Sequence, residues 1–126
     1  MRDLPTIAIV DDDESVRDTT KDLLDSAGWS AATFRSAERF LLSKETCAVK
    51  CLVADMRMPG MTGLELHRHL VAAGTPIPTV LITAYPDDGA RAHALKAGVI
   101  CFLAKPFSAE DFLACIEIAL HGRHLA

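Results

Sequence analysis

The sequence predicts an α/β domain in which helices cover both faces of a parallel sheet. Short apolar runs alternate with segments of helical periodicity five times in succession. Most of these runs are apolar at every position, which is typical of strands that are buried on both faces. Strict alternation of strand and helix favours a parallel sheet, because each helix returns the chain to the edge where the next strand begins.

The composition is that of one folded domain. A chain of 126 residues buries roughly two thirds of its unfolded surface. Half of the residues are hydrophobic and 24% are charged, which excludes a disordered chain. The formal net charge of −4 argues against direct nucleic-acid contact by this domain. No apolar run approaches the ~20 residues that span a membrane, and the N-terminus lacks a signal-peptide core, so we expect a cytoplasmic protein without membrane contact.

The four cysteines fit a reducing compartment. Cys47, Cys51, Cys101 and Cys115 lie mostly in apolar stretches, and we interpret them as free, buried thiols. A metal site formed by Cys47 and Cys51 is an alternative, although three intervening residues that lead into a strand are poor spacing for metal ligands.

The first strand–helix pair has clear boundaries. Ile7–Val10 is an apolar strand that ends at three aspartates, and Asp13 is placed to cap a helix over residues 14–27. Gly28 follows, where a left-handed residue commonly ends a helix.

The second pair is shorter. Ser30–Phe34 alternates weakly and predicts a strand. Ser36 is placed to cap a short helix that carries Phe40 and Leu41 on one side. Lys50–Ala54 is then a third strand, which we expect to be buried.

A turn at Pro59-Gly60 separates this strand from the third helix. That helix ends at Gly74, and its apolar face holds Leu64, Leu66, Leu70 and Val71. Thr79–Thr83 predicts the fourth strand. The spacing of His67 and His69 places them on different faces of the helix, and we assign both to the surface rather than to a metal site.

The last two pairs complete the pattern. Residues Asp87–Ala97 predict an alanine-rich helix that stops at Gly98, and Val99–Leu103 is the fifth strand. Ser108–Asp111 resembles a capping box at the start of a final helix. We expect one domain over residues 1–121, with 122–126 as a tail or the start of a linker to an output domain.

Polar side chains gather where the predicted strands end. Asp11 and Asp12 follow the first strand, and Asp55 ends the third. Thr83 and Lys105 end the fourth and fifth. Ligands of open parallel sheets bind at the carboxyl ends of the strands. Clustered carboxylates need a compensating cation, and Mg²⁺ is the natural one, so the edge indicates phosphoryl chemistry.

These residues form motifs that resemble those of response-regulator receiver domains. The resemblance covers nearly the whole chain, in order and at the family's spacing. It also implies a (βα)5 flavodoxin-like, CheY-like sheet with strand order 2-1-3-4-5. The FixJ-type subfamily is the most similar, from Ser36-Ala37-Glu38 and the stretch after Asp55. The matching motifs are Val10-Asp11-Asp12, Asp55-Met56-Arg57-Met58-Pro59-Gly60, Ile82-Thr83-Ala84 and Lys105-Pro106-Phe107.

The resemblance implies a role for each acidic residue. Asp55 would be the phosphoacceptor of a two-component system. Asp11 and Asp12 would hold Mg²⁺ (Mn²⁺ is possible), together with Asp55 and the backbone carbonyl of Arg57. Mg²⁺ keeps several waters and takes few carboxylates, which fits this sparse set.

The resemblance also implies a phosphorylation switch. Lys105 would pair with a phosphoryl oxygen, Thr83 would turn its hydroxyl towards another, and the small Ala84 would leave room for the group. Phe102 stands where receivers carry a switch aromatic. The bond before Pro106 would be cis. Phosphorylation would remodel the face formed by the fourth helix, fifth strand and fifth helix.

The partners implied are a sensor histidine kinase, a second copy of the chain after phosphorylation, and a DNA-binding output domain in the full-length protein. A stand-alone regulator is the runner-up. Cys101 and Ala104 replace acidic residues of many receivers, so a dimer would rest more on apolar contacts that include Val99. Arg57 and Tyr85 occupy positions that tune phosphoryl lifetime in receivers.

Two other functions fit the sequence less well. A haloacid-dehalogenase-type hydrolase would need an acid two residues after its nucleophile, where Arg57 stands here. A degenerate receiver that only binds partners would lack part of the site. All five strand-end residues are present here: Asp11, Asp12, Asp55, Thr83 and Lys105. We therefore expect a self-modifying phosphoacceptor, which promotes its own phosphorylation and dephosphorylation, rather than a conventional enzyme.

Overall fold

A computed structural model describes residues 6–43 and 48–121. Cys47, with its possible metal site, and the expected tail, 122–126, lie outside the described residues. Among the described helices, none combines the length and apolar character needed to cross a bilayer.

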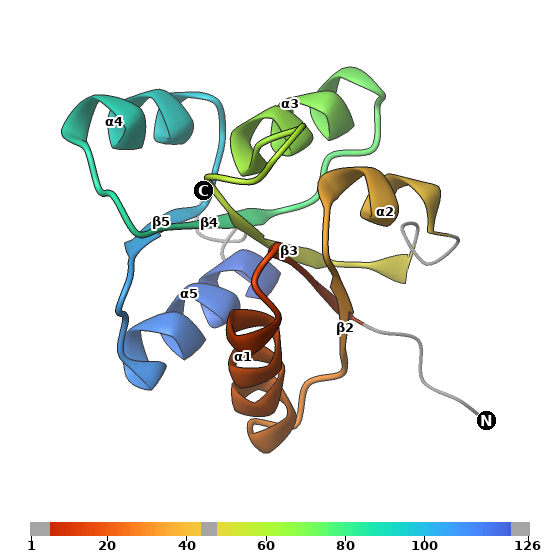
Figure 1. Cartoon of the computed structure of the whole chain (residues 1–126), viewed down its shortest axis with the longest axis vertical. Coiled ribbons are helices and arrows are strands. Elements are labelled where there is room, and N and C mark those ends of the chain that lie inside the picture. The colour runs from red at the N-terminus through yellow and green to blue at the C-terminus, as the bar shows by residue number, and fades with distance from the viewer. Residues whose placement is uncertain (1–5, 44–47, 122–126) are drawn as a thin grey trace.

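Five parallel strands form one sheet in the order β2-β1-β3-β4-β5 (Figure 1), which confirms the predicted fold. The strands are β1 (Ile7–Val10), β2 (Ala31–Phe34), β3 (Cys51–Asp55), β4 (Thr79–Thr83) and β5 (Cys101–Ala104). The helices between and after them are α1 (Glu14–Ser26), α2 (Ala37–Leu42), α3 (Gly63–Ala72), α4 (Asp88–Lys96) and α5 (Ala109–His121).

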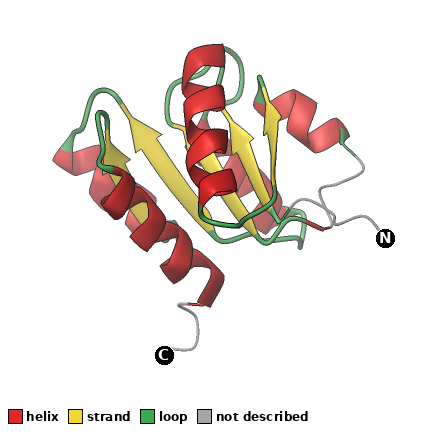
Figure 2. Cartoon of the chain, turned by 90° about the horizontal axis from the view of Figure 1, so that it is seen from below, coloured by secondary structure: helices red, strands yellow, loops and turns green. Residues whose placement is uncertain are grey.

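Helices cover both faces of the sheet (Figure 2). On one face α1 and α5 pack through Leu24, Phe112 and Ile116. On the other face α2, α3 and α4 pack through residues such as Phe40 and Leu66. Successive residues of β1, and of β3 up to Ala54, belong to opposite clusters, which explains why these stretches are continuously apolar.

The capping residues fix the helix starts. Asp13 Oδ1 accepts hydrogen bonds from the N–H groups of Ser15 (2.9 Å) and Val16 (3.2 Å), and Ser36 Oγ accepts from Arg39 N–H (3.0 Å), as predicted. At Ser108 the hydroxyl accepts from the Asp111 N–H at 2.9 Å. This is one arm of the expected capping box.

A complete capping box starts α3 instead, which we did not expect. The Glu65 N–H donates to Thr62 Oγ1 at 3.1 Å, and the Thr62 N–H donates to Glu65 Oε1 at 2.8 Å. The Thr-x-x-Glu pattern in the sequence carries this signal.

The surface assignment of His67 is wrong, whereas His69 is exposed as predicted. The His67 side chain is 4% exposed and joins three elements. Its Nδ1 lies 2.8 Å from Thr79 Oγ1, and its Nε2 lies 3.1 Å from the carbonyl oxygen of Ala97. A carbonyl oxygen can only accept, so Nε2 carries a proton and donates.

The predicted contribution of Val99 to a dimer surface is also wrong, because Val99 is 4% exposed and packs in the core. Gly98 has a φ of +101°, which suits glycine, and Val99 N–H donates to Ala94 O at 3.1 Å. Val99 therefore belongs to the end of α4, and β5 begins at Cys101 rather than at Val99.

Three cysteines are free, as predicted. Cys51 and Cys115 are buried, and Cys101 is half-buried. Burial raises the pKa of the Cys51 and Cys115 thiols to about 12. Both thiols are therefore protonated at neutral pH and poorly nucleophilic.

Candidate functional site

The strand ends bring the predicted acidic residues together at the carboxyl edge of the sheet. Asp55 is the last residue of β3, and Asp11 follows β1, the strand beside it. The Asp11 N–H still pairs with Phe34 O of β2 at 3.1 Å. The hydrogen bonding of the sheet thus extends to the backbone N–H of Asp11.

Asp11, Asp12 and Asp55 form a cluster in which one carboxylate oxygen of each lies within 4.8 Å of the others. Asp11 is 3% exposed and Asp55 is 8% exposed, whereas Asp12 is open to solvent. Two buried carboxylates therefore share the site with one that solvent reaches.

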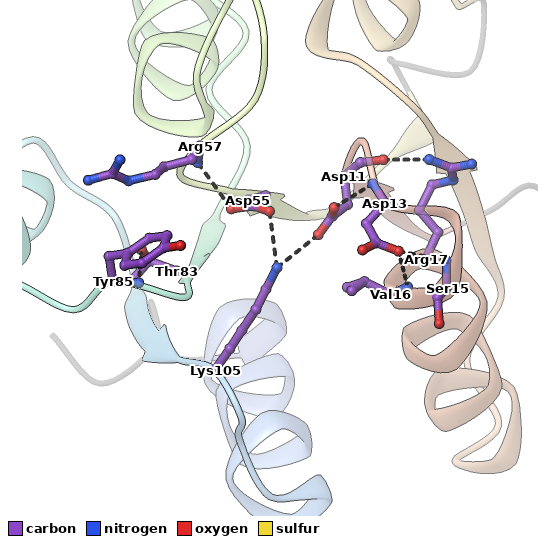
Figure 3. Close-up of polar contacts among 10 residues, drawn as sticks. All are labelled: Asp11, Asp13, Ser15, Val16, Arg17, Asp55, Arg57, Thr83, Tyr85 and Lys105. Carbon is purple, nitrogen blue, oxygen red and sulfur yellow. Dashed lines mark hydrogen bonds and ion pairs between the residues drawn. The ribbon is translucent and has the colours of Figure 1, made fainter.

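Lys105 reaches into this cluster from the end of β5 (Figure 3). Its Nζ lies 3.1 Å from Asp55 Oδ2 and 3.5 Å from Asp11 Oδ2. Lys105 N–H donates to Thr83 O at 2.7 Å, and the Lys105–Pro106 bond is cis, as predicted. The ammonium offsets the charge of the two buried carboxylates.

Each buried carboxylate is held from two sides. Oδ1 of Asp11 accepts from the Asp13 N–H at 2.9 Å, and Oδ1 of Asp55 accepts from the Arg57 N–H at 3.0 Å. The Oδ2 atoms of both face Lys105. The backbone thus orients both side chains, and their second oxygens converge on one point.

The electrostatics of the cluster shift two ionisable groups. Burial, with the nearby charge of Asp55, raises the pKa of Asp11 to about 6, although the Asp13 amide and Lys105 oppose the shift. Burial would lower the pKa of Lys105, but its contacts with Asp55 and Asp11 outweigh burial and raise that pKa. Lys105 is therefore charged at neutral pH.

The donor set suits a hard divalent cation. The three clustered groups are all carboxylates, and carboxylate oxygens are preferred by Mg²⁺ and accepted by Mn²⁺. A cation there would offset the like charges that raise the pKa of Asp11. The Arg57 N–H binds Asp55, whereas the role of the Arg57 carbonyl stays a prediction.

The predicted switch residues Thr83, Ala84 and Phe102 make no hydrogen bond to the clustered aspartates among the described contacts. Thr83 is 2% exposed, and its Oγ1 accepts from the Tyr85 N–H at 3.0 Å. Ala84 is exposed. Phe102 is 7% exposed in the core beneath α3 and α4, and its carbonyl accepts from Arg91 at 3.4 Å.

The side chains of Arg57 and Tyr85 contact each other. The guanidinium carbon of Arg57 lies 4.9 Å from the centre of the Tyr85 ring, within the range of a cation–π interaction. In Figure 3 the Arg57 side chain extends towards Tyr85 and away from Asp55. Arg57 therefore contacts Asp55 through its backbone N–H, while its side chain pairs with Tyr85.

Two residues that position the site were not predicted from the sequence. The Arg17 guanidinium donates to the Asp11 carbonyl at 2.7 Å. A Cβ on Gly63, at the start of α3, would lie 2.4 Å from the Asp55 carbonyl oxygen, so only glycine permits this approach. Glycine directly after the capping Thr62 was a visible signal, whereas the Arg17 contact had none.

A five-stranded parallel sheet in this order, with clustered aspartates and a lysine at its carboxyl edge, defines the receiver class of α/β domain. A family model described as "Response regulator receiver domain" matches residues 7–117. The chain belongs to this family, and its relatives are of the FixJ type.

Curated relatives with similar sequences are regulatory proteins. The chain is 38% identical to the transcriptional regulatory protein FixJ of Bradyrhizobium diazoefficiens, over 90% of this chain and 56% of that protein. It is 41% identical to the response regulator protein TmoT of Ectopseudomonas mendocina, over 90% of this chain and 52% of that protein. The chain thus spans about half the length of the curated relatives it matches.

Solved structures of response regulators have the same fold as this chain. The response regulator StyR has a TM-score of 0.86 and 45% identity, over 97% of this chain and 62% of that chain. The crystal structure of FixJ-N has a TM-score of 0.83 and 36% identity, over 95% of both chains.

Proposed function

We propose that Asp55 accepts a phosphoryl group from a sensor histidine kinase and thereby switches the domain between two conformations. The observation that carries the proposal is the position of the Asp55 carboxylate. One oxygen is bound to the Arg57 amide and the other lies 3.1 Å from Lys105, beside two further aspartates.

In this reaction an Asp55 oxygen attacks phosphorus, and the donor imidazole leaves, which produces an acyl phosphate. Asp11, Asp12, Asp55 and the Arg57 carbonyl would hold Mg²⁺, which would neutralise charge on the transferring group when bound. Lys105 would move from the carboxylates to a phosphoryl oxygen as a point charge. Ala84 would leave space for the group.

The test is intact mass after incubation with acetyl phosphate and Mg²⁺. The wild type is expected to gain one phosphoryl group, and Asp55→Asn is expected to gain none. Asp22→Asn, an exposed aspartate on α1, is the matched control and should label normally. Equal labelling of Asp55→Asn and the wild type would refute the acceptor assignment.

The kinase has a suitable place to dock beside the acceptor. A mostly apolar hollow of about 480 Å³ lies between α1 and the segment after β5, and Lys105 forms part of its wall. A kinase helix seated there would stand next to the Asp55–Lys105 pair. The lining residues are Ser15, Val16, Thr19, Thr20, Leu23, Lys105, Pro106 and Phe107.

An arginine at the exposed Thr19 would block this hollow. We expect Thr19→Arg to lose phosphotransfer from the kinase while it still accepts phosphate from acetyl phosphate. Thr75→Arg, an exposed position after α3, is the control and should react with both donors. Normal transfer from the kinase to Thr19→Arg would remove the hollow from the docking surface.

The output follows from the switch. Phosphorylation would draw Thr83 towards the phosphoryl group, let Phe102 rotate, and remodel the face of α4, β5 and α5. Large exposed apolar side chains on or next to these elements (Leu95, Ile100 and Ile118) would supply a dimer contact.

Residues 1–121 would form the receiver, with residue 122 onwards leading to a DNA-binding output domain of a cytoplasmic regulator. The names and lengths of the FixJ relatives support this, because FixJ is a transcriptional regulatory protein about twice as long as the matched region. The acyl phosphate would be lost by hydrolysis that the domain itself assists.

A further inference from the structure

A further hollow lies at the β2 edge of the sheet, and none of the clustered aspartates lines it. It has a volume of about 400 Å³ and is lined by Arg17, Thr33, Phe34, Arg35 and Arg39. Three of the five lining residues are arginines, and none is acidic. In a chain with a net charge of −4, this concave surface is opposite in sign to the molecule as a whole.

The three arginines come from separate parts of the fold. Arg17 belongs to α1, Arg35 follows β2, and Arg39 belongs to α2. Arg17 is half-buried, and its Nη1 is held by the Asp11 carbonyl at 2.7 Å. The hollow is thus formed at the carboxyl ends of parallel strands, the edge at which such sheets bind ligands.

These arginines have no acidic partner within residues 6–43 and 48–121. The ion pairs found there belong to Lys21, Lys105 and His121. Each guanidinium has five N–H donors in a planar fork that matches phosphate oxygens. The guanidinium groups of Arg35 and Arg39 bind no other described residue, so their donors are available to a ligand.

We propose that this hollow binds the phosphate group of a small phosphorylated molecule. Arg35 and Arg39 would donate to its oxygens, Arg17 would add charge from the rear wall, and the Thr33 hydroxyl would accept or donate one further bond. Phe34 contributes an apolar wall, with its ring packed edge-on against Phe40 at 5.2 Å. The volume lies within the ~300–1,000 Å³ range of small-molecule sites.

The experiment is calorimetric titration with pyrophosphate and with ADP, at fixed ionic strength and without divalent metal. We expect saturable binding of both to the wild type, and a loss of about tenfold or more in affinity for Arg35→Gln/Arg39→Gln. ADP tighter than pyrophosphate would identify a nucleotide, and equal affinities would identify the phosphate group alone. Arg17 is left unchanged because it holds Asp11.

Two controls isolate the hollow. Arg68→Gln/Lys96→Gln removes two exposed positive charges, as the double variant does, and should bind as the wild type does, which excludes a net-charge effect. Asp55→Asn should also bind normally, so this proposal and the phosphoacceptor assignment fail separately. Binding that does not saturate below ~10 mM, or that survives in the double variant, would overturn the proposal.

Discussion

Ionisation of the buried Asp11 carboxyl lowers the stability of the folded state. Its ordinary pKa is 3.8, and burial raises it to about 6 in the folded chain. Below 3.8 the carboxyl is protonated in both the folded and the unfolded states. Between 3.8 and 6 the unfolded chain releases a proton that the folded chain keeps, so rising pH removes stability from the folded state.

Replacement of Asp11 by asparagine should therefore stabilise the metal-free protein at neutral pH. We expect the free energy of unfolding of Asp11→Asn to exceed that of the wild type by a margin that grows from pH 4 to about pH 6 and then levels off. The margin is on the order of 1–3 kcal/mol. Urea unfolding at several pH values measures it.

Saturating Mg²⁺ should reverse this order, because a cation favours the ionised carboxylate that only the wild type offers. Parallel pH profiles of the two proteins without metal would contradict the raised pKa of Asp11.

His67 shows how a buried polar side chain joins elements that are distant in sequence. It lies in α3 and contacts Thr79 at the start of β4 and Ala97 at the end of α4. Thr79 Oγ1 also lies within hydrogen-bond distance of Ile77 O, at 2.8 Å. The network satisfies these groups inside the core, where an unpaired polar group is costly.

His67→Leu should lower the free energy of unfolding by about 1–3 kcal/mol, because the buried Thr79 hydroxyl and the part-buried Ala97 carbonyl both lose their partner. The same substitution at the exposed His69 is the matched control and should change stability by less than about 0.5 kcal/mol. Equal effects in chemical denaturation would show that the buried hydrogen bonds of His67 contribute nothing.

At the scale of elements, the start of α3 can lie close to β3 because Gly63 has no side chain. Gly63 lies against the Asp55 carbonyl, and the capping box of Thr62 and Glu65 fixes the first turn there. The first turn of α3 is thus packed directly on the end of β3, the strand that carries Asp55.

Gly63→Ala should force this helix and strand apart. A Cβ 2.4 Å from the Asp55 oxygen cannot be accommodated, so we expect a loss of ~1–3 kcal/mol and slower labelling by acetyl phosphate. Gly89→Ala in the first turn of α4 is the control, because its Cβ would meet nothing nearer than 3.7 Å. That variant should be neutral or stabilised by up to about 1 kcal/mol.

The elements also show what local sequence determines. The strands, the caps at Asp13 and Ser36, and the cluster of strand-end residues depend on nearby residues or on sheet topology, so they could be predicted. The burial of His67 depends on partners that lie 12 and 30 residues away in the sequence. The burial of Val99 depends on packing beneath α3 and α4. Helical spacing alone carries no information about such partners.

At the scale of the whole molecule, α4 is the helix least fixed by the core. Of its nine residues only Ala94 is buried. Side-chain hydrogen bonds attach it instead: Arg68 to His93, His67 to Ala97, and Arg91 to the Phe102 carbonyl. Phe102 packs in the same cluster as Ala94, so a rotation of Phe102 would be transmitted to α4.

We therefore expect Phe102→Ala to separate phosphorylation from its consequence. Beryllofluoride with Mg²⁺ should change amide hydrogen exchange across residues 88–104 of the wild type and promote its dimerisation. In Phe102→Ala both responses should be lost while Asp55 still gains a phosphoryl group from acetyl phosphate, because Phe102 makes no hydrogen bond to the aspartate cluster.

Leu103→Ala, which shortens a half-buried neighbour on the opposite face of β5, controls for simple loss of packing and should respond as the wild type does. An unchanged exchange and dimerisation response in Phe102→Ala would show that the signal reaches α4 by another route, such as the His67 bridge.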